Sequence, residues 1–106
     1  MLGNETITVL HKNDDNSYST VILTMCNVQS KRNYSIDNKI VNVIDSTVIY
    51  SPVSDMVDVG DYILLGNIEV DLTDFNLSKF LKANETIKVV AVRHQKFFNE
   101  LEIECV

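Results

Sequence analysis

The side chains best suited to chemistry are two histidines and two cysteines, and their spacing matches no catalytic or metal-binding motif. His11 and His94 are far apart in the sequence, and neither belongs to a CxxC, HExxH or HxH pattern. A cysteine could act with a histidine as a nucleophile. However, no residue flanking Cys26 or Cys105 would lower a thiol pKa, and Glu104 would raise that of Cys105. We therefore expect solvated or capping histidines at strand ends, reduced thiols in the core, and no catalytic residues.

The acidic residues form small groups that only superficially suggest metal ligands. The segment Asn13-Asp14-Asp15-Asn16 has closely spaced carboxylates, but it lacks the central glycine and the closing glutamate of an EF-hand loop. Turn formation explains these residues better. Gly60 and Gly66 form neither a GxGxxG pattern nor a P-loop, so nothing supports nucleotide binding. The sequence predicts no metal, no cofactor and no enzymatic activity.

The clearest strand pattern lies near the end of the sequence, where apolar and acidic residues alternate. Because successive side chains of a strand point to opposite faces, one set faces a core and the other faces outward. The inward set is Leu101, Ile103 and Cys105, and the outward set is Glu100, Glu102 and Glu104. The acidic set fits either the wet face of an edge strand or the wall of an aqueous channel. Both interpretations predict exposure.

Two adjacent aromatic residues, Phe97 and Phe98, lie in a polar segment that predicts the turn of a hairpin over residues 94–99. Keeping both rings in water is unfavourable by ~25 cal/mol per Å² of apolar surface. One ring could fold back onto the end of the domain, whereas an exposed pair would mark a docking contact. The sequence favours the two alternatives about equally.

The elements that must position these residues are mostly short strands. Alternation or enrichment in β-branched residues predicts strands over residues 5–11, 18–28, 40–44, 47–50, 62–65, 86–93 and 101–105. The polar stretch from Gln29 to Lys39 predicts a loop or irregular strand, and Asp45-Ser46 predicts a break between two strands. Pro52 closes a strand or lies on an edge.

One short helix is predicted near residues 75–82. Asp74 or Asn76 can cap it, and Leu77, Phe80 and Leu81 share one face. The helix, six to eight short strands and a long polar loop, with no βαβ rhythm, indicate a single all-β domain over residues 1–106. Its architecture is expected to be a small antiparallel β-barrel or sandwich.

Composition and charge exclude several classes of function. The chain has 106 residues, and its 45% hydrophobic fraction is sufficient for a core. The net charge of −6 argues against binding to a nucleic-acid backbone, because affinity for phosphates comes from Lys and Arg. The start of the sequence lacks the pattern of a signal peptide, and no stretch approaches the ~20 apolar residues of a membrane span. We expect a product made in the cytoplasm that binds neither membrane nor specific DNA.

Several segments, in order, resemble a family of small proteins of tailed bacteriophages, the head-tail connector or head-completion proteins (stoppers), often labelled minor capsid proteins. The resemblance is carried by residues 7–12, 21–28, 47–52, 59–66 (Val-Gly-Asp-Tyr-Ile-Leu-Leu-Gly), 77–81 and 87–92. The segment 29–46 departs from the family pattern, since it carries neither the tryptophan nor the glycines expected there.

The resemblance implies a structural protein of the virion neck, made in the host bacterial cytoplasm. Copies are expected to form a ring, dodecameric in the family, below the portal or adaptor and above a tail terminator or tail-tube protein. DNA would pass through the ring without specific binding. The candidate element for reaching the lumen or the portal is the segment from Gln29 to Ile44. Its candidate contact residues are Lys31, Arg32, Asn33, Tyr34, Asp37 and Lys39.

Three other functions stay open on the sequence alone. A tail terminator ring of the same neck would differ in its copy number, with six copies favouring the terminator. A monomeric β-barrel binding module would present a concave aromatic pocket. An enzyme would require a His or Cys with a strongly shifted pKa in an apolar pocket.

Overall fold

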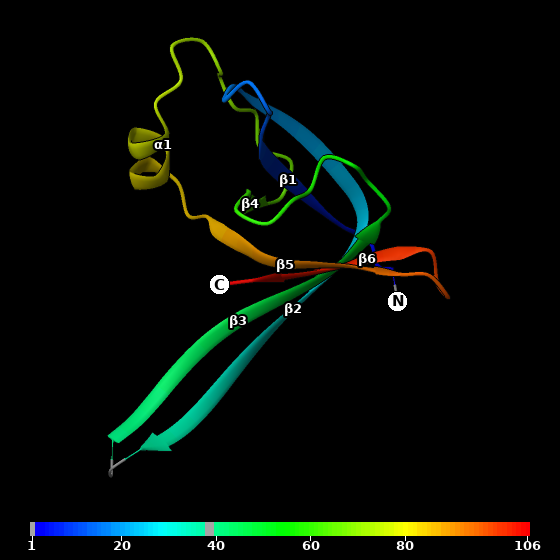
Figure 1. Cartoon of the computed structure of the whole chain (residues 1–106), viewed down its shortest axis with the longest axis vertical. Coiled ribbons are helices and arrows are strands. Elements are labelled where there is room, and N and C mark those ends of the chain that lie inside the picture. The colour runs from blue at the N-terminus through cyan, green and yellow to red at the C-terminus, as the bar shows by residue number, and fades with distance from the viewer. Residues whose placement is uncertain (1, 38–39) are drawn as a thin grey trace.

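The alternating segments of the sequence pair into a closed antiparallel barrel in the computed structural model (Figure 1). The structure describes the backbone of residues 2–37 and 40–106 and the side chains of residues 2–30 and 46–106. The order of strands around the barrel is β1-β2-β3-β6-β5-β4. The strands are β1 (Glu5–Lys12), β2 (Tyr18–Asp37), β3 (Ile40–Pro52), β4 (Tyr62–Leu65), β5 (Ile87–Gln95) and β6 (Glu100–Cys105). The predicted small all-β barrel is confirmed.

The core is formed by the inward residues of these strands. Ile7 and Val9 of β1 are fully buried, as are Ile49 of β3 and Ile103 of β6, which lie directly opposite each other. Each fully buried aliphatic side chain of this kind contributes about 1.5–3 kcal/mol. Leu101, Ile103 and Cys105 are all buried, so the inward half of the predicted alternation is confirmed.

Strand β2 takes part in two pairings because it bends between them. Its residues up to Cys26 pair with β1, and its residues from Asn27 onward pair with β3. At the junction Met25 has a φ of 59°, and the register with β1 shifts between Glu5 and Ile7. A bulge of this kind sharpens the local twist, and it lets one long strand leave the first pairing and enter the second.

Beyond the barrel, β2 and β3 continue as a two-stranded arm, which we define as residues 30–37 and 40–46. The arm extends away from the rest of the molecule at the lower left of Figure 1. The predicted loop or irregular strand over residues 29–39 is therefore wrong for the described part, since the ladder runs without a break to Asp37 opposite Ile40. A polar segment lacks the apolar alternation by which a strand is predicted from sequence. A neighbouring strand can nevertheless pair with its backbone N–H and C=O groups, whatever the hydropathy of its side chains.

The break predicted at Asp45-Ser46 is also absent, because β3 is continuous from Ile40 to Pro52. Asp45 lies opposite Arg32 in the ladder, and Ser46 lies opposite Lys31. Residues of opposite charge at directly opposed positions favour pairing. Pro52 ends the strand opposite Glu100, as expected for a residue that cannot donate a ladder hydrogen bond.

The arm also explains the elongated shape of the chain. The radius of gyration is 15.0 Å, and the principal extents are 48 × 37 × 24 Å. A compact domain of this length has a radius of gyration of about 13 Å. The difference fits a compact barrel with one projecting ribbon (Figure 1).

The predicted helix is present as α1 (Leu77–Ala83). Asn76 caps it, because its side-chain oxygen accepts a hydrogen bond from the Lys79 amide at 3.1 Å. Phe80 packs against Phe75 with a ring-centroid distance of 5.5 Å, and Phe75 packs against Tyr18 of β2 at 5.1 Å. These aromatic contacts connect α1 and its preceding loop to the barrel. The described part of the chain contains no helix with the length and apolar character needed to cross a bilayer.

A glycine in the turn before β4 gives a stability prediction. Gly60 has a φ of 95°, and a Cβ placed there would meet no atom within 4 Å. The cost of Gly60→Ala is therefore backbone strain alone, and we expect the free energy of unfolding to fall by about 1–2 kcal/mol. Urea unfolding measures it, with Val59→Ala, at an exposed neighbour, as the control. Equal stability of the two variants would contradict the strain.

Candidate functional site

The turn between β5 and β6 carries an exposed aromatic pair. Phe97 is 92% exposed and Phe98 is 59% exposed. Their ring centroids are 5.0 Å apart in an edge-to-face arrangement. Such pairs attract each other by about 0.5–1.5 kcal/mol, so the rings are held together while their outer surfaces stay in water. Both rings are exposed, so the predicted alternative in which one ring is buried against the end of the domain does not occur, and the docking contact stays a prediction.

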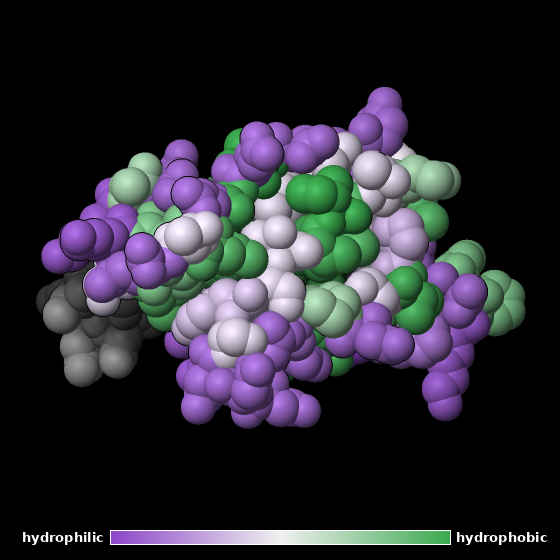
Figure 2. Space-filling view, turned by 90° about the horizontal axis from the view of Figure 1, so that it is seen from above, coloured by the Kyte–Doolittle hydropathy of each residue, from purple (hydrophilic) through white to green (hydrophobic). Residues whose placement is uncertain are grey.

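A cation accompanies this aromatic pair. Lys96 is exposed, and among the described residues it forms no ion pair. His94 is held nearby by Asn99, whose Oδ1 lies 3.4 Å from Nε2. We call Lys96, Phe97 and Phe98 the aromatic tip. In Figure 2 apolar surface occurs at the right-hand edge, the side on which Figure 1 places this turn.

The acidic set of β6 is less exposed than predicted. Glu100 is only 1% exposed, so its expected place on an outward acidic face is wrong. In addition, β6 is not an edge strand, since it pairs with β3 on one side and β5 on the other. Glu100 itself lies between Pro52 and Gln95. Of the three glutamates, Glu104 is the most exposed, with 42% of its side chain in water.

The remaining glutamates are engaged by neighbouring side chains. Glu102 accepts hydrogen bonds from the Tyr50 hydroxyl at 3.3 Å and from the Gln95 amide at 3.1 Å. Glu104 pairs with the Arg93 guanidinium at 3.3 Å. Desolvation and the neighbouring charge of Glu102 raise the pKa of Tyr50. Glu102 and Glu104 are thus paired with side chains of the neighbouring strands. This face therefore carries less unpaired negative charge than the sequence suggested.

The residues proposed to reach a lumen lie on the arm, where only the backbone is described. The structure places on β2, each opposite a residue of β3, Lys31, Arg32, Asn33, Tyr34 and Asp37. Lys39 lies outside the described residues. Their role stays a prediction, although their place on a projecting ribbon is established.

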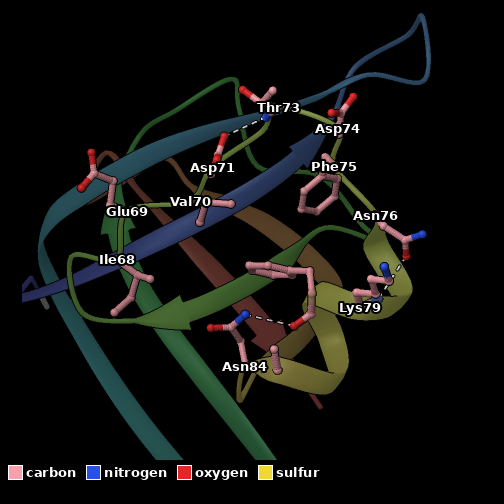
Figure 3. A pocket seen from close by; sticks show the side chains of 12 residues that line it. Ile68, Glu69, Val70, Asp71, Thr73, Asp74, Phe75, Asn76, Lys79 and Asn84 are labelled. Atoms are coloured by element: carbon pink, nitrogen blue, oxygen red, sulfur yellow. Dashed lines mark hydrogen bonds between the residues drawn. The ribbon is translucent and has the colours of Figure 1, made fainter.

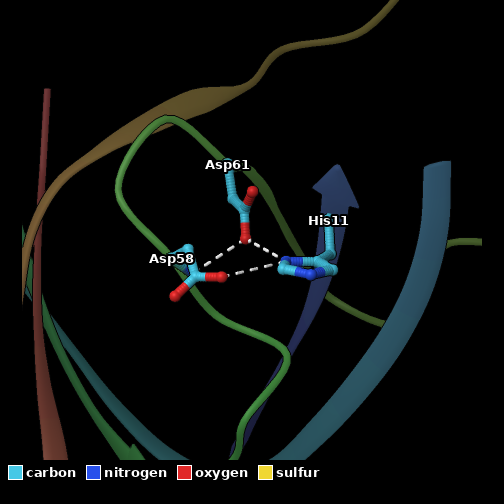
Figure 4. A group of neighbouring side chains, drawn as sticks. All are labelled: His11, Asp58 and Asp61. Atoms are coloured by element: carbon cyan, nitrogen blue, oxygen red, sulfur yellow. Dashed lines mark hydrogen bonds and ion pairs between the residues drawn. The ribbon is translucent and has the colours of Figure 1, made fainter. Parts of the chain in front are cut away.

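A buried histidine–aspartate pair was not found from the sequence (Figure 4). His11 Nδ1 lies 2.7 Å from Asp61 Oδ2, and both residues are buried. Asp61 also accepts hydrogen bonds from the Asp58 amide at 2.8 Å and the Lys12 amide at 3.3 Å. The sequence predicts only a turn at Gly60-Asp61, because His11, the partner of Asp61, is fifty residues away.

With Asp58 this pair forms a group of three possible metal ligands. Asp58 is 70% exposed, and its Oδ2 is 3.9 Å from His11 Nδ1. A nitrogen–oxygen distance of 2.7 Å between His11 and Asp61 is that of a hydrogen bond. Both oxygens of Asp61 are already used by protein donors, so the arrangement fastens the connector between β3 and β4 to the end of β1.

The two cysteines are free and buried in the core. Burial raises the pKa of Cys26 to about 11 and that of Cys105 to about 12. The nearby carboxylates of Glu5 and Glu104 act in the same direction. Both thiols are therefore protonated at neutral pH and poor nucleophiles.

A groove lies between α1 and the loop that precedes it (Figure 3). Its volume is about 370 Å³, and its apolar walls come from Ile68, Val70, Phe75, Phe80 and Ala83. Three acidic residues, Glu69, Asp71 and Asp74, also line it and are exposed to water. Hydrogen bonds from Thr73 lower the pKa of Asp71, so this carboxylate stays charged at neutral pH. We call this site the acidic groove.

The sequence did not reveal the acidic groove as a site. It identified the apolar face of α1 and the Asp71/Asp74 pair separately, while the loop from Ile68 to Phe75 carries no periodic signal. No protein-family model, curated protein or solved structure matches this chain. Its function is therefore inferred from its own residues and geometry.

Proposed function

We propose that this chain is a structural protein of the neck of a tailed bacteriophage. Copies form a ring below the portal or its adaptor, close the DNA-filled head, and offer a platform for the tail. The small antiparallel barrel and the order of the motifs along it are compatible with the head-completion proteins that the sequence resembles.

The observation that carries the proposal is the projecting arm. In the arm, residues 31–37 and 40–46 pair only with each other, so the outer edges of this ribbon meet no other described strand. An isolated two-stranded ribbon is at best marginally stable in water. Neighbouring copies in a ring would flank each arm and cover its open edges.

Charge supports the same arrangement. Each copy carries a net charge of −6. A ring multiplies this charge around a common axis and repels the phosphate backbone, so DNA can slide through without adhering. No cofactor or catalysis is needed for this function.

Two rivals make different predictions. A tail terminator of the same neck would form a ring with six copies. A monomeric binding module is favoured by one observation, the acidic groove with Phe75 and Phe80 in its wall, because concave aromatic sites bind small ligands and peptides. The oligomeric state separates all three functions.

The purified chain is expected to form closed rings of identical copies around a central channel, with twelve subunits. Native mass spectrometry gives the copy number, and negative-stain electron microscopy gives the shape. Antibody labelling of phage particles that carry the gene should mark the head-tail joint. A monodisperse 12.0 kDa species at every concentration, with no label at the joint, would overturn the proposal.

A further inference from the structure

We propose that the aromatic tip of one copy inserts into the acidic groove of the next copy. This inference rests on the proposed function, because it names the contact that links neighbouring subunits of the ring. It commits to a second copy of this chain as the occupant of the groove.

The first support is chemical complementarity. The tip presents two exposed aromatic rings beside a lysine that has no ion-pair partner among the described residues. The groove presents apolar walls with three water-exposed carboxylates and a single cation, Lys79. An apolar body with a positive charge at its side thus meets an apolar cleft with a negative rim. The contact would remove the two rings from water and would pair Lys96 with a carboxylate of the groove.

The second support is size. A cavity of about 150 Å³ lined by aliphatic and aromatic side chains is enough to hold a benzene molecule. The groove has about 370 Å³, so it has room for a phenyl ring, and it is open to water on one side (Figure 3). Its own aromatic residues, Phe75 and Phe80, could stack with the incoming ring in the tilted geometry that they already adopt with each other.

The third support is the placement of the two surfaces. In Figure 1 the β5–β6 turn lies at the right of the molecule, and α1 lies at its upper left. A tip therefore does not reach the groove of its own chain, so the contact joins two copies. Repeated head-to-tail, this contact propagates from copy to copy until it closes into a ring.

The test uses two variants of the full chain that each lose one half of the contact. Phe97→Ser with Phe98→Ser removes the tip, and Ala83→Trp fills the groove with a bulky side chain at an exposed position of α1. Each variant alone is expected to be monomeric, with association weakened at least ~30-fold, as for an interface hot spot. An equimolar mixture should form heterodimers only, because one intact tip meets one intact groove and neither end can extend.

The readout is the mass distribution by analytical ultracentrifugation, with circular dichroism to verify that each variant is folded. The control is Val59→Ser, which removes an exposed apolar side chain away from both surfaces and should assemble like the wild type. If the tip variant still forms rings, the tip–groove contact is wrong while the proposed ring stands. If the mixture gives heterodimers but the wild type forms open filaments, the contact is right and the closed ring is wrong. Failure of the mixture to associate would overturn the contact.

Discussion

Asp61→Ala is expected to lower the free energy of unfolding by about 3 kcal/mol. The Asp61 side chain is buried and accepts three hydrogen bonds, from the imidazole of His11 and from the amides of Asp58 and Lys12. Alanine removes every acceptor and leaves the donors behind. A buried donor without a partner costs about 1–3 kcal/mol, and the two amides near the surface can recover part of this from water.

The loss should also be visible as a lower midpoint of thermal unfolding. For a domain of this size, 3 kcal/mol corresponds to a decrease of roughly 10–20 °C. The matched control is Asp58→Ala, because Asp58 belongs to the same cluster but is 70% exposed and 3.9 Å from His11. An exposed ion pair contributes about 0–1 kcal/mol, so this variant should unfold close to the wild type. Equal effects of the two substitutions would show that Asp61 does not fasten the connector to β1.

Shortening the arm is expected to abolish DNA retention in phage heads while leaving the barrel folded. The ladder places Arg32 opposite Asp45, so residues 33–44 can be replaced by Asn-Gly, which favours the two-residue turn of a hairpin. The shortened chain keeps every described core residue, since those of β3 begin at Val48. The physical reason for leakage is that the ring loses the element proposed to reach its channel.

The measurement is the fraction of particles whose DNA resists nuclease. The matched control changes the opposite hairpin, where Lys12 lies opposite Tyr18 and residues 13–17 can be replaced by the same Asn-Gly turn. Figure 1 places this hairpin at the other end of the molecule from the arm. Heads with the control variant should retain their DNA. Normal retention with the shortened arm would exclude it as the closing element, and equal leakage in both would point to a general loss of assembly.

Local signals predicted a large part of the fold. The helix was found because its cap, Asn76, and its apolar face lie within eight residues of one another. The inward residues of β6 were found because alternation is a property of the strand itself. Phe97 and Phe98 were identified as a candidate docking site because two adjacent phenylalanines in a polar turn are unusual, whatever the fold.

The errors share one cause, which is that the partner of a residue is distant in the sequence. Glu100 was expected in water because alternation within its own strand suggests an outward position, but in the folded domain it is buried. The arm was expected to be a loop or irregular strand because residues 29–39 are polar, but a complementary strand pairs with them. The His11–Asp61 pair was missed for the same reason, since neither residue has a local signal for the other.

By itself the sequence determined the class of the domain, its one helix, the inward face of its last strand and the turn that carries two adjacent phenylalanines, since each depends on the period or composition of a short segment. Only the tertiary structure decided that Glu100 is buried and that the barrel closes with an arm beyond it. It also decided that a groove lies on the other side of the molecule from the aromatic tip. The physical reason is that alternation specifies two sides of a strand, whereas pairing and packing between distant segments decide what lies against each side.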